Sequence, residues 1–173
     1  MKSSCFIPCL FFLLIAISTC LAEHTYTGPE GGSWHDPANW DPPSVPGASD
    51  RVNIPSGATV DLEGGGECGF LNNEGTMQNT GNLNVADVLI NSGSMERAEN
   101  INTGGNLHNT GEISGPYLLN MNVDGELFFN DEDGLISAFA INIDAENADL
   151  ANDGSITVNQ GIRVFSKGNA KQW

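Results

Sequence analysis

A short recurring phrase constrains the fold of this chain more than any other feature of the sequence. It consists of Asn or Asp, a short gap, Gly, one further residue and an apolar residue. It occurs at 73–77, 79–83, 91–95, 109–113, 124–127 and 152–156. Gly75 and Gly93 are 18 residues apart, as are Gly93 and Gly111, and the later spacings to Gly134 and Gly154 are 23 and 20. Recurrence near 20 residues indicates a stack of similar units.

Each phrase predicts a turn followed by a short strand, because Gly tolerates positive φ and Asn or Asp bonds its own backbone. The segments 83–85, 119–123, 141–143 and 156–158 alternate apolar and polar residues, which places the apolar set on one face. We therefore expect an all-β chain that forms a small right-handed parallel β-solenoid. Its coils would stack at about 4.8 Å around aliphatic columns and Asn ladders. An antiparallel sandwich is the alternative, because Asn-Gly turns also form hairpins.

Residues 1–22 predict a secretory signal peptide. Lys2 precedes an apolar run at 6–17, and small residues follow as far as Ala22. The run is too short to span a bilayer, which needs roughly 20 apolar residues. We expect cleavage after Ala22, a secreted extracellular protein and no membrane span in the mature chain. Cys68 then remains without a partner for an internal disulfide, either as a buried hydrophobe or as an intermolecular thiol.

The mature chain divides into three predicted parts: an N-terminal cap with the first strands (23–66), the solenoid coils (67–165) and a polar tail (166–173). A solenoid end is an exposed sheet edge and needs a cap. Trp34 and Trp40 lie six residues apart in a segment that also holds most of the prolines, so they bracket a loop. We expect them to cover the first coil. The alternative is a stacking platform for sugar rings, which would make them a weak glycan-binding site.

The segment 32–62 carries a resemblance to known proteins. It contains Gly-Ser-Trp-His-Asp-Pro-Ala-Asn-Trp, then Val-Pro-Gly-Ala-Ser-Asp, and then a strand that ends at a Pro-Ser-Gly turn. It resembles the opening segment of secreted parallel β-helix (pectin-lyase-like) proteins. It is also similar to the start of the extracellular eight-glycine domain, found in animal surface proteins that include some acting on hyaluronan. The resemblance implies an extracellular location and the beginning of a β-helix, and it brings no catalytic residue.

The net charge and the absence of several motifs limit the partners and reactions that the sequence supports. The chain has 6 Lys+Arg against 22 Asp+Glu and a net charge of −16, which argues against nucleic acid and anionic membranes as partners. No zinc, nucleophile-elbow or phosphate-loop motif is present. The remaining candidates are the carboxylates Asp131, Asp133, Asp144 and Glu146. They could bind Ca²⁺ or be solvated turns. Asp131, Asp133 and Asp144 could alternatively act as acid and base in glycan cleavage.

These observations predict a structural, adhesive or matrix role in an extracellular matrix, at a cell surface or in a biomineral. The partner would be matrix, glycan or mineral, Ca²⁺ is a candidate ligand with no cofactor certain, and self-association is a further expectation. The alternatives are a carbohydrate-active or glycan-binding β-helix protein and a host-interaction or virulence factor. Short turns and about five coils after residue 70 favour a protein that is not an enzyme.

Overall fold

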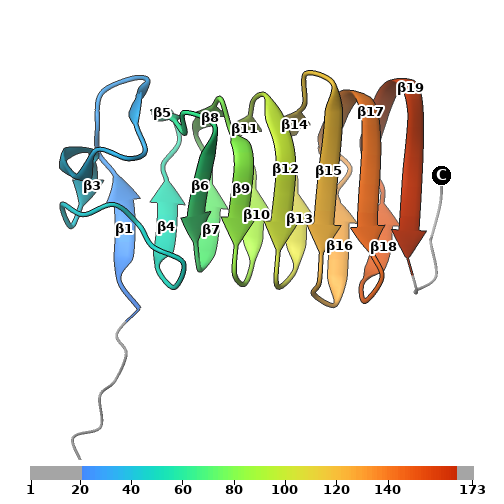
Figure 1. Cartoon of the computed structure of the whole chain (residues 1–173), viewed down its shortest axis with the longest axis horizontal. Coiled ribbons are helices and arrows are strands. Elements are labelled where there is room, and N and C mark those ends of the chain that lie inside the picture. The colour runs from blue at the N-terminus through green and yellow to red at the C-terminus, as the bar shows by residue number, and fades with distance from the viewer. Residues whose placement is uncertain (1–20, 167–173) are drawn as a thin grey trace, which may run out of the picture.

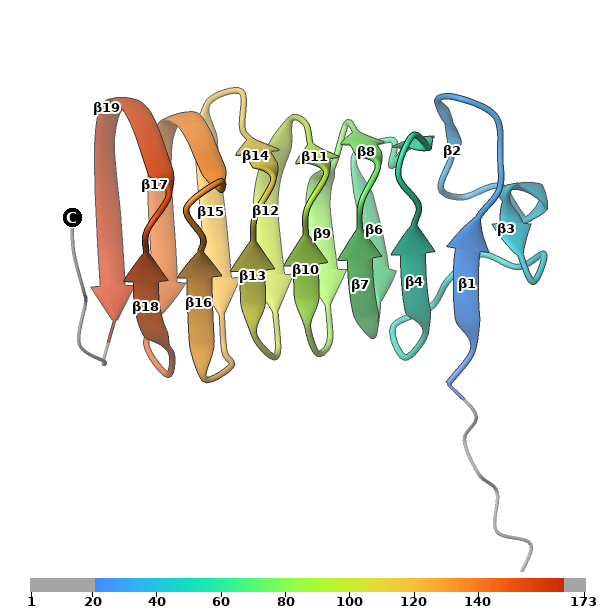
Figure 2. The same ribbon diagram turned by 180° about the vertical axis from the view of Figure 1, so that it is seen from behind.

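The computed structural model describes residues 21–166, which form a β-solenoid whose strands belong to two sheets, one of eight strands and one of eleven (Figure 1). The chain descends in the front strands and rises in the rear ones while it advances from the N-terminus, so the coils wind right-handed (Figures 1 and 2). Strands of successive coils pair in parallel, and the described exception is the antiparallel pair of β1 and β3. The predicted solenoid is confirmed, and the sandwich is not formed.

Three faces make up each coil. The first face contains β1 (Glu23–Tyr26), β4 (Arg51–Ile54), β7 (Phe70–Asn73), β10 (Leu89–Asn91), β13 (Leu107–Asn109), β16 (Leu127–Asn130) and β18 (Asp149–Asn152). The second contains β2 (Gly32–Ser33), β5 (Thr59–Asp61), β8 (Thr76–Gln78), β11 (Ser94–Met95), β14 (Glu112–Ser114) and the beginning of β17 (Leu135–Ala145). The third contains β6 (Gly65–Cys68), β9 (Gly81–Val85), β12 (Ala98–Thr103), β15 (Leu118–Val123) and the end of β17. β19 (Ser155–Ser166) pairs along both parts of β17.

Apolar columns fill the interior because parallel pairing sets each residue above its counterpart in the preceding coil. The first face contributes Leu71, Leu89, Leu107, Phe128 and Leu150. The second contributes Met77, Met95, Ile113 and Ile136, and the third Leu83, Ile101, Met121 and Ile143. None of these side chains is more than 1% exposed. Burying each one stabilises the fold by about 1.5–3 kcal/mol relative to exposure.

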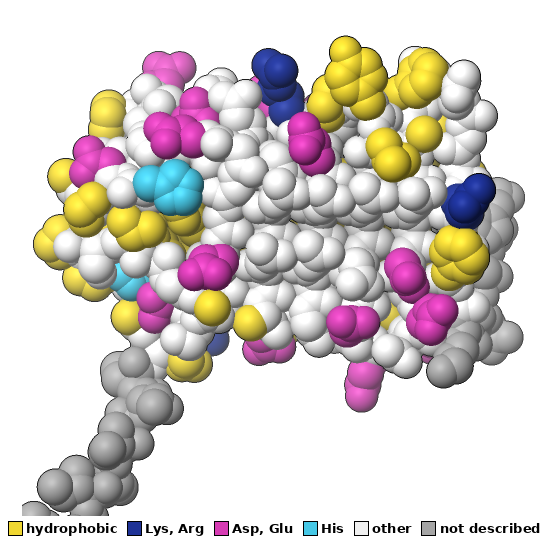
Figure 3. Space-filling view, in the orientation of Figure 1, with side chains coloured by type: hydrophobic (Ala, Val, Ile, Leu, Met, Phe, Trp, Pro, Cys, Tyr) yellow, Lys and Arg dark blue, Asp and Glu magenta, His cyan; other side chains and the backbone are white. Residues whose placement is uncertain are grey.

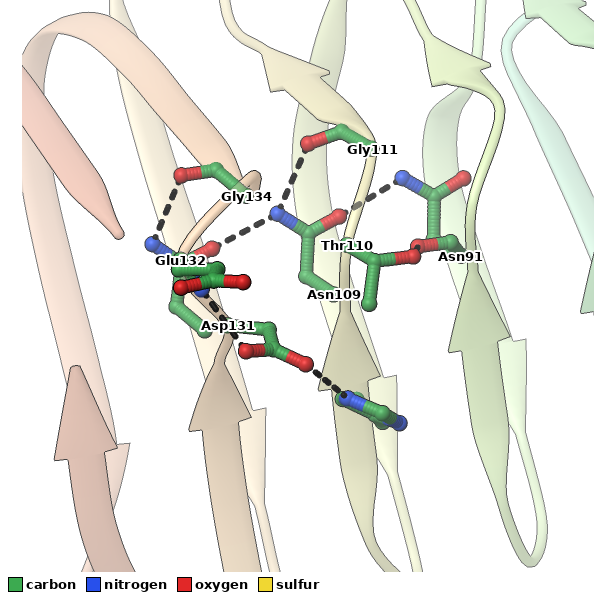
Figure 4. A network of polar contacts seen from close by, with 9 residues as sticks. Asn91, Asn109, Thr110, Gly111, Asp131, Glu132 and Gly134 are labelled. Carbon is green, nitrogen blue, oxygen red and sulfur yellow. Dashed lines mark hydrogen bonds and ion pairs between the residues drawn. The ribbon is translucent and has the colours of Figure 1, made fainter. Parts of the chain in front are cut away.

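A buried ladder of asparagines runs along the end of the first face. Asn73, Asn91, Asn109, Asn130 and Asn152 stack in register, and each Nδ2 donates to the Oδ1 of the next at 2.7–2.8 Å. The amides also donate to the backbone of the following turn, as Asn109 does to the carbonyl of Gly111 at 3.0 Å (Figure 4). The predicted inward ladder therefore exists. It supplies hydrogen bonds to amides that would otherwise be costly to bury, although Asn73 Oδ1, at the first end of the ladder, has no partner among the described residues. It also explains why Asn precedes Gly in the repeat.

The repeat glycines are required for a different reason from the one the turn chemistry suggests. Gly75, Gly93 and Gly111 do not have positive φ. A Cβ added at Gly93 would overlap the carbonyl oxygen of Gly75, and one at Gly111 would overlap that of Gly93. Successive turns therefore approach too closely for any side chain. The positive-φ explanation holds at Gly81.

The N-terminal cap closes the first end of the interior. Tyr26, Trp34 and Trp40 are 1–2% exposed. The rings of Trp34 and Trp40 meet edge to face with centroids 4.9 Å apart, and Trp40 Nε1 donates to the carbonyl of Trp34 at 2.8 Å. Between them, Asp36 caps the short 3₁₀ helix η1 (Pro37–Asn39), and β3 (Trp40–Asp41) then pairs with β1. This burial agrees with the predicted capping role.

Two sequence predictions fall mainly outside the described residues. They are the signal peptide at 1–22, of which 21 and 22 are described, and the polar tail at 166–173, of which only Ser166 is described. Within 21–166, no helix has the length and apolar character needed to cross a membrane.

Replacing Asn91 by Ala tests the buried ladder. The substitution leaves Asn109 Oδ1 without its donor and removes the acceptor that Asn73 Nδ2 uses. We expect the free energy of unfolding to fall by about 2–4 kcal/mol, because buried polar groups lose partners. Urea denaturation measures it. Asn102→Ala, on the solvent side, is the control and should cost less than about 1 kcal/mol; equal losses would contradict the ladder's role.

Gly93→Ala tests the close approach of the coils. Because the methyl group would overlap backbone of the preceding turn, we expect destabilisation of more than about 3 kcal/mol or failure to fold. Gly161→Ala is the matched substitution, since a Cβ there meets nothing within 4 Å. Thermal melts followed by circular dichroism compare the two. Similar melting temperatures for both variants would show that the turns have room to separate.

Candidate functional site: an asparagine array on the third face

The outward positions of the third face hold two straight ranks of asparagine. The first rank is Asn82, Asn100, Asn120 and Asn142, and the second is Asn84, Asn102 and Asn122. We call these seven residues the asparagine array. They come from β9, β12, β15 and β17, and they alternate with the buried column of the same strands. The third face is turned to the viewer in Figure 3, where uncharged side chains form continuous rows across its centre.

Hydrogen bonds between coils hold the array amides in place. In the first rank Asn100 donates to Asn82 Oδ1, Asn120 to Asn100 at 2.8 Å, and Asn142 to Asn120 at 3.0 Å. In the second rank Asn102 donates to Asn84 at 2.9 Å. An amide has two N–H groups and a carbonyl with two lone pairs. Since a ladder bond uses one of each, the array keeps spare donors and acceptors for a ligand.

The array is neutral although the chain carries a net charge of −16. Charged residues lie at its ends in the same register: Glu67 beside Asn84, Asp144 beside Asn122, and Arg163 beside Asn142. A ligand that covers the centre of the array therefore removes no charged side chain from contact with water. This arrangement suits an uncharged partner better than an ion or a charged polymer.

Two shallow hollows mark the ends of the array. At the cap end, a hollow of about 360 Å³ lies between Trp34, Val45, Pro46 and the array residues Asn82 and Asn84. At the other end, one of about 340 Å³ is lined by Asn120, Asn122, Asn142, Asp144, Arg163 and Phe165. The array is thus an elongated surface with relief at both ends, a shape that fits a linear ligand or a stack of chains.

Exposed apolar side chains border the later coils of the array. Tyr117 is 77% exposed, Phe165 49%, Leu118 44% and Phe139 43%. Leu118 precedes Asn120 by two residues, so it points outward on the same strand, and it pairs with Ala140 in the next coil. Figure 3 shows hydrophobic side chains gathered beside the rows of the array. Aromatic surface and amide groups are therefore available together.

The two Trp residues that the sequence suggests for glycan binding do not present exposed ring faces. Trp34 and Trp40 are almost fully buried in the cap, and only Trp34 reaches the wall of a hollow. The exposed rings near the array are Tyr117, Phe139 and Phe165 instead. The sequence held a signal for the array, because the polar partner in the strands 119–123 and 141–143 is always Asn. What it could not show was that these residues share one face.

The four candidate calcium ligands are divided between two corners of the coil. Asp131 and Asp133 lie in the turn after β16, where Asp131 Oδ2 is 3.5 Å from His108 Nε2 (Figure 4). Asp144 lies near the end of β17, and Glu146 in the turn after it. Across 21–166, no group of three His, Cys, Asp or Glu side chains is placed to hold a metal ion.

The separation of these carboxylates between two corners also argues against glycan cleavage by Asp144 together with Asp131 or Asp133. The two corners are separated by the length of β16, four residues, or roughly 13 Å at about 3.3 Å per residue. Paired carboxylates of glycosidases are roughly 5–10 Å apart. Asp144 is therefore not paired with Asp131 or Asp133 in the manner of such an enzyme.

Comparison with known proteins gives no further guide. No family model matches this chain, and neither a curated protein nor a solved structure matches it.

The thiol of Cys68, at the edge of the third face, yields a prediction. Burial raises its pKa to about 12, with Asp50 and Glu67 adding to the effect, and its side chain is fully buried. Because the thiolate is the reactive form, we expect the native chain to resist a thiol reagent at pH 8 and the urea-unfolded chain to react fully. A colorimetric thiol assay measures both. Rapid reaction of the native chain would favour an accessible intermolecular thiol.

Proposed function

We propose that this protein is a secreted adhesive protein that binds an extracellular polysaccharide through the asparagine array without cleaving it. One observation carries the proposal: seven outward-facing amides, each exposed or half-buried, form two straight and uncharged ranks on a strongly acidic chain. The other two faces carry mixed outward residues, such as Thr76, Ser94 and Glu112 in one register column.

The chemistry of the array is suited to sugars. A polysaccharide presents hydroxyl groups along its edges and C–H groups on its ring faces. Fixed amides can both donate to and accept from the hydroxyl groups. The exposed rings of Tyr117, Phe139 and Phe165 supply apolar surface for the ring faces. Secretion belongs to the same proposal and is supported by the predicted signal peptide at 1–22.

Two other roles receive less support from the described residues. A mineral surface calls for ranks of carboxylates, whereas the array is built of amides, and carboxylates such as Glu67 and Asp144 only flank it. Cleavage calls for a close carboxylate pair, and Asp131 and Asp144 occupy separate corners. Binding without catalysis is the role that uses the most regular surface of the molecule.

A double substitution in the middle of the array tests the proposal. Asn100→Ala with Asn102→Ala removes one amide from each rank. We expect affinity for the bound polysaccharide to fall about tenfold or more, because two hydrogen bonds of about 1 kcal/mol each are lost. Sedimentation of the mature chain with insoluble cellulose, chitin and xylan measures the bound fraction.

The control is Thr76→Ala with Ser94→Ala, a pair in neighbouring coils of the second face whose side chains make no hydrogen bond among the described residues. It should bind as the parent chain does, with the same circular dichroism spectrum. Equal loss in both double variants, or full binding by the array variant, would remove the array from the proposal.

A further inference from the structure

We infer that the polysaccharide bound by the array carries acetamido groups and is recognised as a hydrogen-bonded stack of chains, as in crystalline chitin. This inference rests on the proposed function and names its substrate class. It follows from the spacing and the direction of the amide ladders.

The spacing argument begins with the coils. Parallel strands lie about 4.7–4.9 Å apart, and this distance sets the repeat of the array along the solenoid. The same repeat arises wherever amides related by translation are joined by N–H···O=C hydrogen bonds, whatever molecule carries them. A stack of polysaccharide chains joined through acetamido groups therefore repeats at nearly the same interval. The repeat of such a stack therefore matches the repeat of the array across all four strands, β9, β12, β15 and β17.

The direction of the ladders adds a second point of agreement. All four hydrogen bonds in the array run the same way: the amide of the later coil donates to the carbonyl of the earlier one. Translationally stacked acetamido groups also share a single direction. The spare N–H and lone pair of each Asn can therefore face complementary acetamido groups at every step, with one chain for each coil.

Apolar residues beside the array match the methyl groups of an acetamido sugar, and the lack of charge matches its neutrality. Leu118 and Ala140, adjacent in register and beside Asn120 and Asn142, offer an apolar strip for the acetamido methyl groups. The centre of the array carries no charge, which suits a neutral polymer. A deacetylated chain instead presents amines, which would be drawn to the acidic corners of the protein and not to the amides.

Binding to three insoluble polymers tests the inference. Crystalline chitin, chitosan and cellulose share a β-1,4-linked backbone and differ in carrying acetamido, amino or hydroxyl groups. The mature chain is sedimented with each at pH 8 and 0.5 M NaCl, where long-range charge attraction is screened. We expect affinity for chitin to exceed that for the other two by about tenfold or more, equivalent to about 1.4 kcal/mol. Soluble chitin oligosaccharides should compete poorly because a single chain offers no stack.

Two variants show whether the array causes the preference. The Asn100→Ala and Asn102→Ala double variant should lose the chitin preference, and the Thr76→Ala and Ser94→Ala variant should keep it. Asn122→Ala is a second probe that leaves the ladders intact, because its side chain makes no ladder bond among the described residues, and we expect a several-fold loss.

The outcomes separate this inference from the proposed function. Array-dependent binding that is equal on chitin and cellulose overturns the acetamido inference and leaves the proposed function standing. Chitin-selective binding that survives all array substitutions places the site elsewhere and overturns both. Absence of binding to any polysaccharide also overturns both, as does array-dependent dimer formation without polysaccharide binding.

Discussion

Parallel hydrogen bonding between successive coils is the constraint on which this structure depends. It sets each residue directly above its counterpart at a fixed interval, so that any residue type repeated in the sequence becomes a straight rank in space. Inward ranks become the apolar columns and the buried ladder from Asn73 to Asn152. Outward ranks become the asparagine array. Core stability and the candidate binding surface are therefore two consequences of the same stacking.

The sequence was sufficient to predict the solenoid because the 18-residue recurrence and the period-two alternation depend only on local order. The inner ladder is predictable for the same reason, and the Trp cap is predictable because a solenoid end needs large hydrophobic residues to cover it. The role of Gly93 is not predictable from the local turn pattern, since the contact that excludes a side chain there comes from Gly75, one coil away. The candidate acidic residues are close together in the sequence, whereas in the structure Asp131 and Asp144 lie at different corners of the coil. Whether a residue lies on a given face or at a corner depends on how many residues each side of the coil contains. The repeats vary in length, so the sequence alone does not reveal that number.

Charge and amide groups occupy different parts of the surface. Acidic residues lie at array ends, at corners and on the second face, as Glu67, Asp131 and Glu112 do, and their like charge disfavours association through those parts of the surface. The neutral array is left as the most ordered exposed surface of the described chain. Six of its seven amides are already held by their neighbours, so binding immobilises few side chains and the entropic cost of association is small. A rigid and repetitive partner gains most from such a surface, because every coil can contribute the same contact.

The most direct test of this account is the response of individual asparagine side-chain amides to a polysaccharide, followed by ¹H–¹⁵N NMR of residues 23–173 with suspended chitin particles. The account predicts broadened or shifted signals for Asn100, Asn102, Asn120 and Asn122. It predicts unchanged signals for Asn91 and Asn109, which lie in the same coils but face the interior. Perturbation confined to the other two faces, or no perturbation of the array at saturating polysaccharide, would contradict it.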